Sequence, residues 1–199
     1  MFQIRVHGRG GQGVVTAAEL LSIAAFMEGK YAQAFPSFGS ERMGAPVVAF
    51  CRIDDKPIRT REPVMQPDAL IIQDPTLFNA VDVLQGLSGD GYLLVNSSRS
   101  FAELGIGKFV DAFPAGHVRH VAATEIALAH TGRPIPNATL LGALAAMTKV
   151  IGLESVCAAL RERFPGKVGE LNIVAARAAF VGLACRFRAE LRNPCHRRW

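Results

Sequence analysis

A run of glycines directly after an alternating apolar segment constrains the fold of this chain more than any other feature. Phe2, Ile4 and Val6 alternate with polar residues, as they would in a β-strand. Residues 8–13 then read Gly-Arg-Gly-Gly-Gln-Gly, a G-x-G-x-x-G pattern, and residues 14–28 have the apolar spacing of a helix. A strand, a glycine turn and a helix in this order predict the first unit of a Rossmann-like sheet. In such a unit, the backbone N–H groups at the helix start can bind an anion.

The rest of the chain continues the alternation of strands and helices and then becomes helical. The predicted strands cover residues 31–35, 47–53, 69–73, 92–96 and 118–123, and the predicted helices cover residues 126–131, 137–151, 154–164 and 168–188. Asn137 is the predicted N-cap of its helix. We therefore predict an α/β fold with a Rossmann-like, mostly parallel sheet flanked by helices, a helical C-terminal third, and a single domain over residues 1–199.

Composition and charge narrow the classes of partner. Charges or glycines interrupt the apolar runs within about 18 residues, so we predict no transmembrane helix and no membrane partner. The N-terminus lacks a basic segment followed by an apolar one, so we expect no secretory signal and a cytoplasmic protein. The net charge is +5, but basic and aromatic residues do not interleave, so we expect no nucleic-acid partner.

Two groups of residues that often bind cofactors lack the required spacing. The cysteines are Cys51, Cys157, Cys185 and Cys195, and no two of them are spaced as C-x-x-C. We therefore expect neither an iron–sulfur cluster nor a zinc ion on this chain. Residues 89–91 read Gly-Asp-Gly, like the start of a thiamine–metal motif, but no Asn-Asn pair follows, and we interpret them as a solvated turn. We expect His7 to pack against the glycine loop.

Two longer segments carry a resemblance to a known family. Residues 8–13 resemble the G-x-G-G-Q-G signature of the gamma subunits of pyruvate:ferredoxin oxidoreductase and its relatives. Residues 34–46 resemble their second signature, an aromatic–Gly–x–Glu–Arg–x–Gly loop. Shorter matches extend the resemblance over nearly the whole chain, in the order Arg52-Ile53, Pro67-Asp68, Asp74-Pro75, residues 95–98, Asn137 with Gly142, and Asn172 with residues 179–180.

The resemblance implies that this chain is an accessory subunit of a multisubunit enzyme. Members of the family oxidatively decarboxylate a 2-oxo acid on thiamine diphosphate with Mg²⁺, and usually transfer the acyl group to coenzyme A. Electrons leave through [4Fe-4S] clusters to ferredoxin or another acceptor. The resemblance also implies that alpha, beta and delta-type subunits carry the thiamine and the clusters. This chain alone is then expected to be inactive and to hold none of these cofactors.

The candidate binding residues lie in the two signature loops. They are Gly8, Arg9, Gly10, Gly11, Gln12, Gly13 and Arg42. We predict that both loops face the thiamine-bearing subunits and help to form the entrance for coenzyme A. Arg42 has an alternative role, an internal ion pair with Glu41 that shapes its loop.

Two other functions stay open. A stand-alone NAD(P)-binding Rossmann oxidoreductase would use the same glycine loop. Against it, residues 31–37, which contain the second predicted strand, lack the acidic residue that holds the ribose. A pure assembly module would bind no ligand, and the glycine loop would then be only a closely packed turn.

Overall fold

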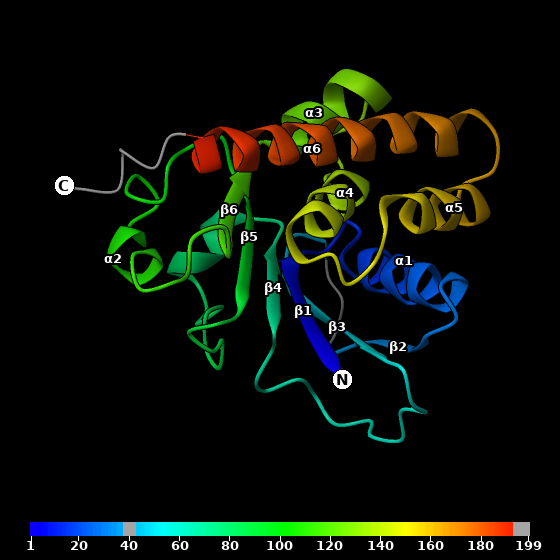
Figure 1. Cartoon of the computed structure of the whole chain (residues 1–199), viewed down its shortest axis with the longest axis horizontal. Coiled ribbons are helices and arrows are strands. Elements are labelled where there is room, and N and C mark those ends of the chain that lie inside the picture. Colours follow the sequence, from blue (N-terminus) through cyan, green and yellow to red (C-terminus); the bar gives the residue numbers. More distant parts are fainter. Residues whose placement is uncertain (38–42, 193–199) are drawn as a thin grey trace.

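Six strands form one sheet in a computed structural model that describes residues 1–37 and 43–192, with side chains as far as Cys185 (Figure 1). They are β1 (Phe2–Arg9), β2 (Tyr31–Pro36), β3 (Pro46–Asp54), β4 (Ala69–Ile72), β5 (Tyr92–Asn96) and β6 (Val118–Val121). The order across the sheet is β2-β3-β1-β4-β5-β6. β1, β4, β5 and β6 pair in parallel, whereas β3 runs antiparallel to both β1 and β2. The predicted mostly parallel sheet is confirmed, with β3 as its reversed strand.

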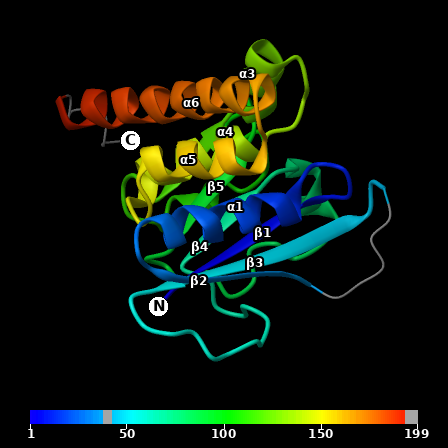
Figure 2. The same cartoon turned by 90° about the vertical axis from the view of Figure 1, so that its right-hand side faces the viewer.

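Helices cover both faces of this sheet, and most of them stack in layers on one face. They are α1 (Val14–Met27), α2 (Gly107–Val110), α3 (Ala123–Thr131), α4 (Asn137–Thr148), α5 (Leu153–Arg163) and α6 (Lys167–Arg192), with a short 3₁₀ helix η1 (Pro75–Asn79). α1 lies next to the sheet, and α4 and α5 pack against α1. α6 runs across the outside of these helices (Figure 2). α2 lies apart from this stack, near the β6 edge of the sheet (Figure 1). The predicted helical C-terminal third is therefore confirmed.

The sheet separates two apolar cores, because successive side chains of a strand point to opposite faces. Ile71 and Leu94 pack in the larger core, under α1, α4 and α5. Leu70 and Leu93 face the other way, into a smaller core beneath η1 and the segment around α2. The short strands β4 and β5 are buried on both sides, which explains their nearly continuous apolar sequences.

α6 is unusually apolar for a helix on the outside of a domain. Within the described residues, its segment Lys167–Cys185 is long and apolar enough to cross a membrane by length and composition alone, with a mean hydropathy of 1.5. Packed helices of globular domains pass the same test. Ile173, Ala176 and Leu183 are buried in the larger core, so α6 behaves as a packed helix. Only 33% of the segment is buried, so the apolar character extends to its outer side.

Candidate functional site

The glycine loop joins β1 to α1 in a conformation that needs glycine at two positions. Gly11 and Gly13 have φ values of 95° and 73°, in the left-handed region. A Cβ atom at Gly13 would also lie 2.6 Å from Asn137 Nδ2. Among the described residues, no side chain caps α1. The first N–H groups of this helix are therefore available to a ligand.

Asp74, at the end of β4, fixes the glycine loop from the neighbouring strand. Its Oδ2 accepts hydrogen bonds from Arg9 Nε and from Gln12 Nε2, each at 3.1 Å. Burial alone would raise the pKa of Asp74, but hydrogen bonds from Thr76 and Gln12 and the charge of Arg9 hold it below its ordinary value. Arg9 also donates to the carbonyl of Gly44 at 3.0 Å. Arg9 and Gln12 therefore hold the loop in shape.

The end of the second signature segment lies against the glycine loop. Gly10 donates its N–H to the carbonyl of Ala45 at 2.9 Å, and Gly44 donates to the carbonyl of Gly10 at 3.1 Å. Met43 is 87% exposed, and its Sδ would lie 2.7 Å from a Cβ atom at Gly11. The structure thus brings the two signatures together. Arg42, predicted to bind a ligand, lies outside the described residues, as does Glu41.

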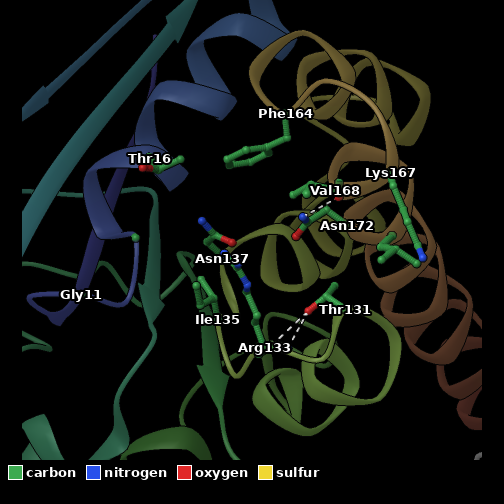
Figure 3. Close-up of a pocket in the computed structure, with 12 residues that line it drawn as sticks. Gly11, Thr16, Thr131, Arg133, Ile135, Asn137, Phe164, Lys167, Val168 and Asn172 are labelled. Atoms are coloured by element: carbon green, nitrogen blue, oxygen red, sulfur yellow. Dashed lines mark hydrogen bonds between the residues drawn. The ribbon is translucent and has the colours of Figure 1, made fainter.

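A pocket of about 370 Å³ opens at the start of α1 (Figure 3). Its walls come from α1, from the segment between α3 and α4, and from the junction of α5 and α6. The lining residues are Gly11, Gly13, Thr16, Thr131, Arg133, Ile135, Asn137, Phe164, Lys167, Val168, Leu171 and Asn172. Within the part of the chain that the structure describes, the lining contains two cationic side chains and no acidic one.

The electrostatics of this pocket favour an anion. Neither Arg133 nor Lys167 forms an ion pair with the residues that the structure describes. Gly13 is the N-cap of α1 and lines the same pocket, so the positive end of the helix dipole lies at the pocket. Helix N–H groups and unpaired cations together form the kind of site that binds phosphate or carboxylate groups.

Asn137 differs from its prediction as a helix N-cap. Pro136 occupies the N-cap and Asn137 is the first residue of α4, a difference of one position that reflects the α-like backbone of Pro136, with φ −80° and ψ −4°. The Asn137 side chain is 4% exposed, and its Oδ1 accepts a hydrogen bond from Ala138 N at 2.7 Å. Its Nδ2 has no hydrogen-bond partner within residues 1–37 and 43–185 and borders the pocket (Figure 3). This donor, on a side chain that is otherwise buried, is free to bind a ligand.

The other motifs of the sequence lie away from the pocket. Gly89 and Asp90 are exposed in a turn before β5, as predicted, whereas Gly91 is buried. Cys51 and Cys157 are buried, and Cys185 is exposed on α6. In the described parts of the chain, no three His, Cys, Asp or Glu side chains gather as they would around a metal ion.

His7, at the end of β1, is buried and should make stability depend on pH. Burial, and then the charge of Arg5, lowers the pKa of His7 to about 4, from an ordinary value of 6.5. The folded chain therefore keeps His7 neutral. Stability is fully present above about pH 6.5 and falls towards pH 4, because the unfolded chain binds the proton first. Carboxylates with lowered pKa values lose their contribution only below about pH 4.5.

Urea unfolding should therefore show a loss of about 1 kcal/mol between pH 7 and pH 5.5. The variant His7→Gln should lose most of this dependence, because glutamine does not titrate in this range. A variant that keeps the full pH dependence would show that another group carries it.

Known proteins resemble this chain over most of its length. A family described as pyruvate ferredoxin/flavodoxin oxidoreductase matches residues 3–181. The "Pyruvate/ketoisovalerate oxidoreductases common subunit gamma" of Thermococcus kodakarensis is 51% identical over 180 residues, which cover 90% of this chain and 96% of the relative. The crystal structure of the pyruvate oxidoreductase subunit PORC from Thermotoga maritima superposes with a TM-score of 0.75 at 38% identity, covering 90% of this chain and 95% of that one.

One larger enzyme contains the same fold. The 2-oxoglutarate:ferredoxin oxidoreductase from Magnetococcus marinus, solved with 2-oxoglutarate, coenzyme A and succinyl-CoA bound, superposes with a TM-score of 0.69. The match covers 93% of this chain and 31% of that one, at 15% identity. At this identity the likeness shows the fold alone.

Proposed function

The chain belongs to the pyruvate ferredoxin/flavodoxin oxidoreductase family and is a gamma-type subunit of such an enzyme, and we propose that the pocket beside its glycine loop forms part of the coenzyme A site. The resemblance predicted from the two signature loops is thereby confirmed. In the proposed complex, alpha, beta and delta-type subunits carry thiamine diphosphate with Mg²⁺ and the [4Fe-4S] clusters. The complex oxidatively decarboxylates a 2-oxo acid in the cytoplasm and passes electrons to ferredoxin or another acceptor.

The observation that carries this proposal is the charge of the pocket. Among its described lining residues, Arg133 and Lys167 are cationic and none is acidic, and the uncapped start of α1 adds N–H donors. Coenzyme A is an anion whose nucleotide end carries phosphate groups and the flat aromatic ring of adenine. Phe164 and Leu171 supply an apolar wall for a base beside the cations. A volume of about 370 Å³ suits one end of this large molecule, so its thiol end would extend towards the thiamine-bearing subunits.

The glycine loop has two roles in this proposal. Gly11 and Gly13 line the pocket and bring the backbone close to the ligand. Arg9 and Gln12 hold the loop through Asp74. Gly8 lets α1 approach β1, because a Cβ atom there would lie 2.6 Å from Val14 Cγ2, and Gly10 pairs with the second signature segment. We also propose that Arg42, which belongs to that segment, binds the ligand.

The alternative of a stand-alone NAD(P)-dependent enzyme gains no support from the site. β2 ends at Pro36, and the strand contains no carboxylate that would hold a ribose.

The double variant Arg133→Gln/Lys167→Gln tests the proposal in the complete, co-purified complex. We expect the KM for coenzyme A to rise about tenfold, because two charge-assisted contacts are lost. The KM for the 2-oxo acid should stay unchanged. The control variant Lys56→Gln removes an exposed cation from the turn after β3 and should leave both constants unchanged. An unchanged KM for coenzyme A in the double variant would overturn the assignment of the pocket.

A further inference from the structure

The exposed side of α6 carries a continuous apolar stripe. Leu171, Val174, Ala178, Val181 and Cys185 follow one another at alternating spacings of three and four residues. Val174 and Val181 are 46% and 56% exposed. We call these five residues the α6 seam. On an isolated globular domain this side of a surface helix would be polar.

A hollow beside the α6 seam can receive a side chain. It has a volume of about 120 Å³ and lies between α6 and the start of α3. Its lining residues are Val121, Ala122, Ile126, Ala178, Ala179, Gly182 and Leu183. The small side chains at Ala178 and Gly182 allow another backbone to come close.

Alternating spacings of three and four are those of a helix that packs against another helix. They keep one apolar seam facing the partner, whose side chains insert between those of the seam. The α6 seam and its hollow provide both elements. We propose that the α6 seam docks an amphipathic helix of another subunit of the oxidoreductase, with acidic residues beside its apolar stripe. This inference rests on the proposed function of the chain as a subunit.

The charge of α6 favours an acidic partner over a second copy of this chain. Residues 186–192 read Arg-Phe-Arg-Ala-Glu-Leu-Arg, with three arginines and one glutamate. Parallel pairing of two copies would set these basic ends side by side. Antiparallel pairing centred on Ala178 would set each basic end over the start of the other α6. There Lys167 is exposed, and Glu170 is already paired with Arg161 at 2.8 Å.

The side chains of the α6 seam also argue against a membrane surface. Helices that lie on membranes insert bulky apolar groups such as Trp, Phe and Leu. The middle of the seam consists of Val174, Ala178 and Val181, and Gly182 lies beside it. Small residues of this kind bury little area in lipid but fit closely against another helix.

The double variant Val174→Glu/Val181→Glu tests the inference by co-expression of all subunits, with an affinity tag on a subunit other than this chain. We expect at least about tenfold less of the variant chain in the purified complex, because docking would bury two unpaired carboxylates. The purified variant chain should keep its thermal midpoint, since both side chains are exposed in it. The milder variant Val181→Ser, which adds no charge, should lower recovery in the same direction.

The matched control is Met65→Glu. Met65 is 63% exposed and belongs to the segment between β3 and β4. This segment runs along the opposite side of the molecule from α6 (Figure 1). The Met65→Glu variant should be recovered like the wild type.

Three outcomes would contradict the inference. Equal recovery of the double variant would leave the proposed function standing and remove the docking site. Self-association of the isolated chain that the double variant abolishes would assign the seam to a second copy. Sedimentation of the isolated chain with anionic lipid vesicles, lost in the double variant, would assign it to a membrane. A wild-type chain that co-purifies with no other subunit would instead contradict the proposed function.

Discussion

Replacing Arg5 by alanine is expected to lower the free energy of unfolding by about 3 kcal/mol or more. Arg5 lies on β1 and is buried, with 6% of its surface exposed. It donates to the carbonyls of Val64 and Val83 at 3.3 Å and to that of Gln85. Burial lowers the pKa of Arg5 and the charge of Asp82 opposes this shift, so the group stays charged. One side chain thereby joins β1 to two separate segments that lack regular secondary structure.

The effect is expected to be large because three carbonyl groups would lose the one hydrogen-bond donor that they share. Alanine would leave three carbonyl groups without their donor, and burying an unpaired carbonyl costs about 1 kcal/mol or more. Arg5→Lys should recover only part of the loss, because a single ammonium group cannot reach three carbonyls in the geometry of the planar guanidinium.

Urea unfolding of the isolated chain measures the effect, and limited proteolysis locates it. Cleavage should increase within residues 55–68 and 81–90, the segments that Arg5 holds. The control Arg59→Ala removes an exposed arginine from the first segment and should change stability by less than about 0.5 kcal/mol. If Arg5→Ala were as stable as Arg59→Ala, the three hydrogen bonds would have no net role.

The elements with strong local patterns could be predicted from the sequence, and those fixed by distant contacts could not. The prediction for β5 at residues 92–96 is confirmed at both ends, and that for α1 differs by one residue at its end. The spacing of apolar residues within each of these elements identifies it without information from the rest of the chain. η1 and α2 were not predicted, because each is shorter than two turns and has no complete period. The reversed direction of β3 depends on which strand it pairs with, and a single strand pattern does not contain that information.

Only one wall of the candidate site, the glycine loop, could be predicted from the sequence. The glycine loop has a recognisable spacing because backbone approach requires glycine at defined positions. Arg133 and Lys167 belong to no motif. The connection between α3 and α4 brings Arg133 to the start of α1, and the packing of α6 over α4 brings Lys167 there. Asp74 appeared in the sequence as part of a short match to the family. Its contacts with Arg9 and Gln12 supply the physical reason for that match.

Gly142 is the second position where a small change should have a large effect. The family resemblance included it, but its reason is visible only in the packing of α4 against α6. A Cβ atom at Gly142 would lie 2.1 Å from the carbonyl oxygen of Ala176 and 2.8 Å from its Cα. Both atoms belong to the backbone of α6, which cannot move aside as a flexible side chain can. The two helices would have to separate along a buried interface.

We expect Gly142→Ala to lower the free energy of unfolding by about 1 to 3 kcal/mol, even though alanine favours helix more than glycine does. Gly142→Val should fail to give a stably folded chain, because it adds two more methyl groups at the same contact. Gly182→Ala on α6 is the matched control, since a Cβ atom there meets nothing within 4 Å among the side chains that the structure describes. That control should gain about 0.5 to 1 kcal/mol in urea unfolding of the isolated chain. If Gly142→Ala gained stability like Gly182→Ala, the close approach of α4 and α6 would not be required for folding.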